Sequence, residues 1–274
     1  MAVPGKTFTA KPFPVEEADS RFAELARLGF NSNRLVLPWG ILEHEGPGIY
    51  DEAYLAYLRK ILLAAEKQNS TLWIDPCLWE TSEDGPPAWT LEALGINTAA
   101  LSVSKQYAAA LMGTLFFAAS AFAPALRLDT AIPAMDAAGF QDWMQTCYIE
   151  AFAHARRRLK KCSAISGWGT VYEAPPGLIG CRDLAEGENT TAGPRPSPFT
   201  AMVTASGYNP EGISIWKEGF GCPWKAAGIW DDSEGTPRLL KAAYFASRSG
   251  RPVSFDKDFL TPFTSRFTRR FEVH

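Results

Sequence analysis

The sequence predicts an α/β fold with a parallel sheet, and three observations lead to this prediction. Amphipathic helical patterns alternate with short apolar strands along the first 180 residues, and this order is typical of βαβ units. Each predicted strand is bounded by Gly, Pro or turn residues. Glu173 follows the third strand closely, at the C-terminal strand end where (β/α) barrels keep their catalytic groups.

The first two helix–strand pairs lie in the N-terminal third. The first helix has one apolar face and ends at Gly29, which supplies a left-handed stop. Residues 33–38 then form a predicted strand. The second helix begins after Asp51, a predicted N-cap, and residues 71–75 form the next strand, which Pro76 ends.

A long helix precedes the third strand. Apolar side chains mark this helix between residues 140 and 159, and its basic C-terminal end suits the negative pole of the helix dipole. The third strand covers residues 165–170. After Pro176 no further strand–helix pair is evident, so we expect one domain over 1–274 in which βα units (1–180) precede a loop-rich region (181–274).

The composition indicates an ordered globular protein. With 274 residues, 46% hydrophobic and 21% charged, the chain is long enough for one large domain. Its net charge of −3 argues against a nucleic-acid partner, which requires a basic excess. The 9 Trp and 17 Phe suit either a site that stacks sugar rings or an aromatic-rich core, and both interpretations stay open.

The five cysteines are well separated and form no CxxC pair. This spacing predicts neither a disulfide framework nor a zinc site, and we expect no metal and no cofactor. The thiols suit a reducing compartment. The first residues lack the apolar segment of a secretory signal, so the expected location is cytoplasmic.

Residues 107–126 carry no charge and are long enough for a membrane helix. The segment is dominated by alanine and contains Thr114, Ser120 and Pro124, and alanine contributes little to membrane insertion. We therefore expect a buried helix over 107–122 instead of a stable membrane span.

Several short stretches carry a resemblance to one family. They are residues 28–39 (LGFNSNRLVLPW), 43–52 (EHEGPGIYDE) and 85–93 (GPPAWTLEA), then 114–118, 122–124, 196–199, 228–231, 237–240 and 250–253. Together they resemble glycoside hydrolase family 5, in the branch of glucosylceramidase, endoglycoceramidase-related and steryl-β-glucosidase enzymes. The resemblance covers nearly the whole chain in the same order.

The resemblance implies a β-glucoside or glycolipid substrate and a retaining mechanism with two glutamates. One protonates the leaving oxygen and the other attacks the anomeric carbon, about 5–5.5 Å away. Glu173 falls on the acid/base position. Arg34 falls on the arginine that supports the nucleophile, although a structural ion pair is an equal alternative. Trp39, Trp89 and Tyr172 are further candidate substrate contacts, and each Trp, Trp79 included, suits a core position equally well.

The chain departs from the family at two motifs. The family's Asn-Glu-Pro is Tyr172-Glu173-Ala174 here, so the amide that hydrogen-bonds the sugar 2-hydroxyl is absent. The family's Asp-Pro-His-Gln-Asp begins Asp75-Pro-Cys77 here, so its active-site histidine is absent. The three histidines are expected to be structural or solvated: His44, His154 and His274.

No second carboxylate at a comparable strand end follows Glu173 in the sequence, so the nucleophile is missing. The remaining acids considered are poor candidates because they lie on an altered loop or in turn-rich stretches: Glu80, Glu83, Asp231 and Asp232. We expect a chain that keeps only the acid/base and is inactive or very weak. The alternatives are a non-catalytic glucoside- or lipid-binding remnant and a fragment of a split or mispredicted gene.

Aligned with the family, the sequence predicts a partial TIM-type (β/α)₈ barrel that lacks the first strand and the C-terminal half and has a long irregular C-terminal insertion. A complete barrel takes about 250 residues. Three or four strands would leave free edges and an exposed apolar face, so self-association is expected. Arg34, Cys77 and Glu173 should lie at the same end of the partial sheet.

Overall fold

The computed structural model describes residues 11–78, 86–129, 132–190 and 193–273. The chain forms two compact units, which are described separately below. Unit 1 comprises Met1–Trp89, Thr146–Ala174 and Thr264–His274, whereas unit 2 comprises Thr90–Gln145 and Pro175–Phe263. Each unit combines segments that are distant in the chain. The units therefore differ from the two consecutive regions, 1–180 and 181–274, that are expected from the sequence.

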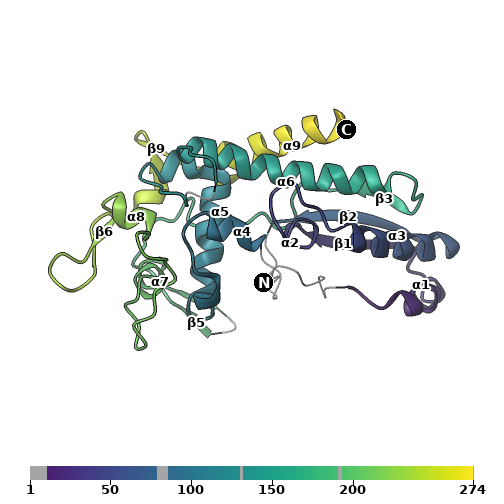
Figure 1. The fold of residues 1–274 in the computed structure, drawn as a ribbon, viewed down its shortest axis with the longest axis horizontal. Helices are drawn as coiled ribbons and strands as arrows, with labels where there is room; N and C mark the ends of the chain where they lie inside the picture. The colour runs from purple at the N-terminus through teal and green to yellow at the C-terminus, as the bar shows by residue number, and fades with distance from the viewer. Residues whose placement is uncertain (1–10, 79–85, 130–131, 191–192, 274) are drawn as a thin grey trace. The chain divides into compact units, whose positions relative to one another are not determined.

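Unit 1 is built on a three-stranded parallel sheet in the order β1 (Ser32–Pro38), β2 (Thr71–Cys77), β3 (Ile165–Trp168) (Figure 1). A bridge between Cys77 and Tyr172 continues the pairing beyond β3. The predicted α/β class with a parallel sheet is confirmed. Among the described residues, β1 and β3 each pair with one strand only, and self-association through their free edges stays a prediction.

The three helices that the sequence predicts before β1, after Asp51 and before β3 are present, whereas the short helices and the C-terminal helix were not predicted. Asp51 caps α3, since its Oδ1 accepts the backbone N–H of Tyr54 at 2.7 Å. The elements other than the sheet are η1 (Val15–Glu17), α1 (Ala18–Arg27), α2 (Trp39–Leu42) and α3 (Glu52–Lys67), with α4 (Ala88–Glu92), α6 (Ala137–Leu159) and α9 (Thr261–Val273) extending into unit 2.

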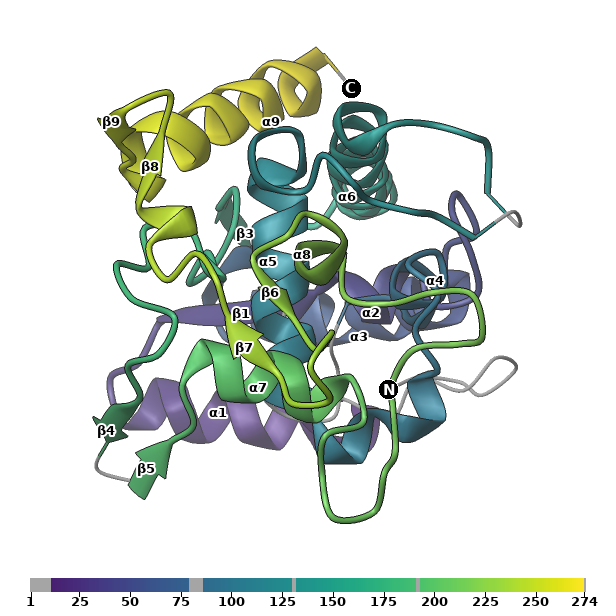
Figure 2. The same ribbon diagram turned by 90° about the vertical axis from the view of Figure 1, so that its left-hand side faces the viewer.

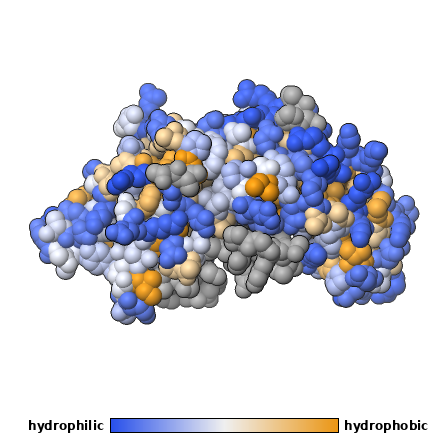
Figure 3. All heavy atoms as spheres, viewed as in Figure 1, coloured by the Kyte–Doolittle hydropathy of each residue, from blue (hydrophilic) through white to orange (hydrophobic). Residues whose placement is uncertain are grey.

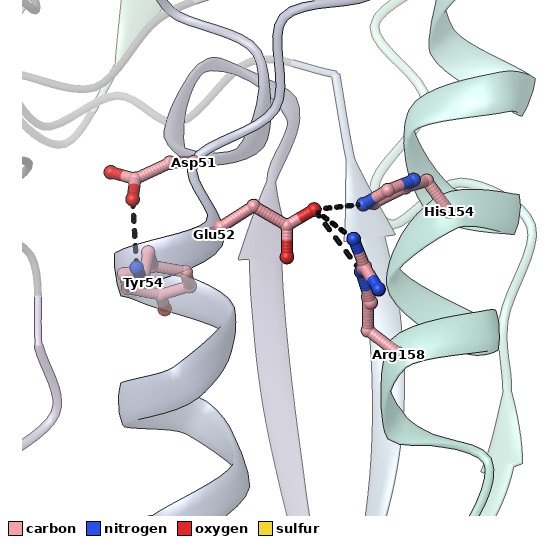
Figure 4. Close-up of polar contacts among 5 residues, drawn as sticks. All are labelled: Asp51, Glu52, Tyr54, His154 and Arg158. Carbon is pink, nitrogen blue, oxygen red and sulfur yellow. Dashed lines mark hydrogen bonds and ion pairs between the residues drawn. The ribbon is translucent and has the colours of Figure 1, made fainter.

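Polar contacts join α3 to α6 within unit 1 (Figure 4). Oε1 of Glu52 accepts hydrogen bonds from His154 Nε2 and Arg158 Nη2, both at 2.8 Å. Burial alone would raise the pKa of Glu52, but the hydrogen bonds from Arg158 and His154 outweigh it and lower the pKa. The expected structural role of His154 is consistent with this contact.

Unit 2 is organised around α5 (Lys105–Phe122), a helix kinked at Ala118. Leu111, Leu115 and Phe116 on this helix are fully buried. The rings of Phe116 and Phe263 pack edge to face, with their centres 5.1 Å apart. The predicted helix over 107–122 is confirmed. Within the described parts of the chain, no helix has the length and apolarity needed to cross a membrane.

Apart from α5 and the first part of α6, the described residues of unit 2 form short elements (Figure 2). Among them are three pairs of antiparallel strands and several short helices, in keeping with the irregular region expected after Pro176. They are η2 (Thr98–Val103), β4–β5 (Glu188–Thr190, Gly193–Arg195), α7 (Pro198–Ala205), α8 (Pro223–Ala226), β6–β7 (Trp230–Asp231, Arg238–Leu239), η3 (Tyr244–Ala246), β8–β9 (Ser247–Arg248, Arg251–Pro252) and η4 (Asp256–Leu260).

Aromatic side chains contribute heavily to both cores. Trp39 in unit 1 and Trp224 and Trp230 in unit 2 are fully buried. On the face shown in Figure 3 the surface is mostly hydrophilic, with small separate apolar patches. The aromatic-rich core, one of the two interpretations left open by the composition, therefore accounts for several of these side chains.

Candidate functional site

One face of the unit 1 sheet carries polar and exposed side chains. The register pairs Arg34 with Trp73 and Val36 with Asp75, and alternation along a strand places these four side chains on the same face. The side chain of Arg34 is 54% exposed, and Trp73 is 44% exposed. The face expected to be apolar is therefore partly polar.

Asp75 holds two neighbours on this face. Its Oδ2 accepts a hydrogen bond from Arg34 Nε, and its Oδ1 accepts one from Trp73 Nε1 at 3.0 Å. Two glycines, Gly167 in β3 and Gly169 just after it, leave room for these side chains. A Cβ at Gly169 would collide with the Asp75 carboxylate, and a Cβ at Gly167 would collide with the Trp73 ring. The buried carboxylate is thus fixed by its neighbours on both strands.

Glu173 lies immediately after the sheet. Tyr172 bridges to Cys77, the last residue of β2, and donates its backbone N–H to the Pro76 carbonyl at 2.6 Å. Glu173 then adopts φ +42°, a left-handed conformation that non-glycine residues seldom take. The interaction with Glu173 is the largest of the effects that raise the pKa of Tyr172.

Arg34 reaches this strand end only through its side chain. Arg34 is the third residue of β1 and pairs with Trp73, so the expectation that Arg34 ends its strand is wrong. Its guanidinium carbon nevertheless lies 4.2 Å from the centre of the Tyr172 ring, because an arginine side chain spans several residues along a sheet face. The hydrogen bond to Asp75 is the largest of the effects that raise the pKa of Arg34.

We refer to Asp75, Arg34, Tyr172 and Glu173 as the Glu173 cluster. The structure brings together three side chains proposed from the sequence, Arg34, Tyr172 and Glu173, and adds Asp75. Cys77 and Glu173 lie at the same sheet end, as expected. Strand-end position was the signal for Glu173, whereas nothing local in the sequence identified Asp75 as the anion that binds Arg34.

The two tryptophans proposed as substrate contacts both bind the segment around Glu43. Trp39 is fully buried and donates its Nε1–H to Glu43 Oε2 at 2.6 Å. Its ring packs edge to face with the rings of Trp89 and Tyr148, and the ring centres are 5.5 and 5.6 Å away. Trp89 is partly buried and donates its Nε1–H to the Glu43 carbonyl at 2.7 Å. Both indole groups are therefore engaged in holding the segment around Glu43.

The other residues considered as acids or bases have structural contacts or lie outside the described residues. Within unit 2, Asp231 pairs with Arg238 at 3.7 Å and Asp232 with Lys225 at 2.6 Å. His44 is buried. Outside the described residues lie Trp79, Glu80, Glu83 and His274. In the described part of the chain, no three His, Cys, Asp or Glu side chains converge as metal ligands would.

Glu43 is a buried acid that the sequence analysis did not single out. Its carboxylate accepts the Trp39 indole N–H and the Gly48 backbone N–H, the latter at 2.5 Å. Burial raises the pKa of Glu43 to about 7, although both hydrogen bonds oppose the rise. The turn-rich stretch from Glu43 to Gly48 was the local signal for a buried acceptor at this position. A tight loop leaves backbone N–H groups unpaired, and these need a hydrogen-bond acceptor.

The pKa of Glu43 predicts that unit 1 loses stability as pH rises from about 4.5 to 8. Below pH 4.5 the carboxyl is protonated whether the chain is folded or unfolded, so it imposes no penalty. Above that, the unfolded chain ionises first, and the free energy of unfolding falls by up to roughly 3 kcal/mol. Glu43→Gln should show a clearly smaller fall in urea denaturation midpoints, whereas Glu45→Gln, at an exposed neighbour, should retain it. Equal pH dependence in both variants would contradict the assignment.

Comparison with known proteins shows which proteins this chain resembles in sequence and fold. No family model matches the chain. It is 28% identical to a glucosylceramidase of Rhizopus delemar and 29% identical to one of Cryptococcus neoformans, in each case over 95% of this chain. It is also 22% identical, over 96% of this chain, to an ergosteryl-beta-glucosidase of Saccharomyces cerevisiae.

The chain is similar to glucosylceramidases and steryl glucosidases. It spans about half the length of these relatives, covering 45%, 44% and 46% of them. A solved structure of Cryptococcus neoformans sterylglucosidase 1 superposes with a TM-score of 0.82 at 24% identity, over 96% of this chain and 48% of that one. The fold of this chain thus matches that of a glycosidase.

Proposed function

We propose that this chain carries the acid/base part of a glycosidase site for β-glucosides with lipid aglycones. The observation that carries the proposal is the position of Glu173, directly beyond the bridge that extends the parallel sheet. Similarity to glucosylceramidases over 95% of the chain supports the substrate class. The chemistry needs one carboxyl group that protonates the leaving oxygen.

In this proposal the sheet is part of a glycoside hydrolase family 5 barrel. Strands β1, β2 and β3 would be its second, third and fourth strands. Their parallel order and the TM-score of 0.82 with a sterylglucosidase support this assignment. Glu173 would then lie at the C-terminal barrel rim, where such enzymes act.

A retaining mechanism also needs a second carboxylate about 5–5.5 Å from the first. Asp75 is the nearest acid in the cluster, but both of its oxygens already accept hydrogen bonds from Arg34 and Trp73. Among the described residues, no other carboxylate directly follows a strand of this sheet. We therefore assign to this chain proton transfer at the leaving oxygen, and not attack on the sugar.

An added nucleophile tests the proposal. General acid catalysis alone contributes about 10²–10⁴-fold, well below the roughly 10⁶-fold or more of working enzymes, so the purified chain should hydrolyse steryl β-glucoside or glucosylceramide very slowly. With sodium azide, C–N bond formation at the anomeric carbon accompanies C–O cleavage, and Glu173 protonates the released aglycone. We expect α-glucosyl azide to accumulate, as detected by mass spectrometry and NMR.

Two outcomes would contradict the proposal. If no glucosyl azide forms from any β-glucoside, the chain does not supply an acid/base site. Fast hydrolysis in water that disappears in Glu173→Gln would show that a second carboxylate is present, with Glu80 and Glu83 the first to test. Matched α-glucosides serve as the control, because inversion at their anomeric carbon would require attack from the opposite face.

A non-catalytic glucoside-binding site is the second candidate function. The observation that favours it is Tyr172 at the position of the family's amide, because the group that hydrogen-bonds the sugar 2-hydroxyl in the family is then absent. This candidate predicts saturable binding of lipid glucosides together with no azide product.

A further inference from the structure

We propose that a cavity in unit 2 binds one neutral lipid alcohol, with the apolar body of the ligand inside and its hydroxyl end among the charged side chains at the rim. The cavity has a volume of about 530 Å³, within the roughly 300–1,000 Å³ that is usual for sites of small molecules. All of the described residues that line it belong to unit 2. The inference therefore stands apart from the proposed role of Glu173, a residue of unit 1.

The inner wall of the cavity is apolar. The side chains that form it come from α5, from the segment that follows Gly177 and from α7: Tyr107, Ala110, Leu178, Ile179 and Ala201. Water that lies against such a wall finds few hydrogen-bond partners, so its replacement by an apolar group is favourable. The wall therefore suits the apolar body of a ligand.

Close packing against α5 fixes one side of this wall. Gly177 adopts φ +62°, and a Cβ at this position would lie only 2.4 Å from the Ala110 carbonyl oxygen. The Thr114 hydroxyl accepts the backbone N–H of Leu178 at 2.8 Å and donates to the Ala110 carbonyl at 2.7 Å. Because these contacts exist without a ligand, this side of the cavity is preformed and binding orders little of it.

Charged side chains of both signs line the solvent-exposed part of the cavity. Arg182, Glu186 and Arg195 are exposed. Asp183 is partly exposed, and its Oδ1 accepts the Ala185 backbone N–H at 2.8 Å. Two cations and two anions balance, so this rim gives no net attraction to a phosphate, a sulfate or a carboxylate. A hydroxyl suits it, because a hydroxyl can donate to a carboxylate and accept from a guanidinium.

A free sugar fits this cavity less well than a lipid alcohol does. A sugar ring that stacks on protein needs an exposed aromatic face. Tyr107 is the aromatic side chain among the described residues of the lining, and it is only 2% exposed, with its hydroxyl 3.2 Å from the Cys222 thiol. Apolar wall and charge-balanced rim together favour a ligand that is mostly apolar, carries no net charge and ends in a hydroxyl.

Protection of the Cys181 thiol from alkylation measures occupancy of the cavity. Cys181 lines the cavity, is partly exposed and is not in a disulfide, so iodoacetamide can modify it and peptide mass spectrometry gives the rate. Dodecan-1-ol is the probe. It should slow alkylation in a saturable way, by about 10-fold when its concentration is about ten times its Kd.

Two substitutions at Ala226 are the controls, because this residue is exposed, belongs to unit 2 and is not part of the lining. The thiol added by Ala226→Cys should be alkylated at the same rate with and without dodecan-1-ol. Ala201→Trp fills the cavity and should abolish the protection of Cys181, whereas Ala226→Trp should retain it. If Ala201→Trp does not fold, as judged by circular dichroism, Ala201→Leu should weaken the protection instead.

The charge of the head group tests the class of ligand. Dodecanoate and dodecylammonium have the same chain length, and each should need at least about 10-fold more ligand for equal protection, because the balanced rim does not compensate for desolvation of their charge. Equal protection by dodecanoate would overturn the neutral class.

No protection at the solubility limit of dodecan-1-ol, equal protection in the folded Ala201 variant, or protection of the thiol in Ala226→Cys would each overturn the site. Alkylation needs no turnover. Glucosyl azide formation without protection of Cys181 would therefore refute this inference alone, and protection without azide product would refute the proposed function alone.

Discussion

Glu173→Gln should lower azide-supported turnover of phenyl β-glucoside by about 10²–10⁴-fold and leave turnover of 2,4-dinitrophenyl β-glucoside nearly unchanged. Phenolate is a poor leaving group that needs a proton as the glycosidic bond breaks, whereas dinitrophenolate leaves without one. The two substrates share the same sugar, so the contrast isolates proton donation from sugar binding.

The measurement is the release of each phenol by absorbance at saturating azide. Glu211→Gln, at an exposed glutamate of unit 2, is the matched control and should behave as the original chain with both substrates. Equal losses for both substrates in Glu173→Gln would mean that the side chain affects binding or folding and does not donate the proton.

Trp39→Ala should lower the free energy of unfolding by about 3–5 kcal/mol. Trp39 is fully buried, so its loss leaves a large cavity, and Glu43 also loses the indole N–H that satisfies one of its oxygens. Trp39→Phe should cost less, about 1–3 kcal/mol, because most of the volume remains while the hydrogen bond is removed. Urea denaturation followed by near-ultraviolet circular dichroism measures both.

Trp73→Ala is the comparison that decides the role of Trp39. Trp73 is 44% exposed, so its removal should cost clearly less stability than removal of Trp39. If Trp39→Ala leaves stability unchanged but weakens glucoside binding, Trp39 is a substrate contact, as the family resemblance implies, and the packing explanation fails.

Local sequence patterns were sufficient for the three strands and for α1, α3 and α6. Period-3.6 apolar faces predicted α3 and α6, and Asp51 predicted the start of α3 because capping depends on neighbours three residues away. Glu173 could be singled out because a parallel sheet brings all its C-terminal strand ends to one edge. These inferences need only short-range geometry and strand direction.

The remaining features depend on packing between distant segments. Arg34 reaches Tyr172 although it lies early in β1, and sequence position does not reveal where a long side chain ends. Glu43 is buried and accepts hydrogen bonds from Trp39 and Gly48, while Glu45, two residues on, is exposed. Trp39 directly follows β1 and Trp89 lies in α4, and tertiary contacts determine the exposure of both.

Binding of a glucoside at Glu173 is the most direct test of the central claim. Carboxyl-¹³C-labelled glutamate signals would be recorded while octyl β-thioglucoside, which resists hydrolysis, is added below its micelle concentration. We predict a saturable shift of the signal that disappears in Glu173→Gln, and a much weaker shift with the α-anomer. Shifts confined to other glutamates, with the Glu173 signal unmoved at saturation, would contradict the assignment of Glu173 to a β-glucoside site.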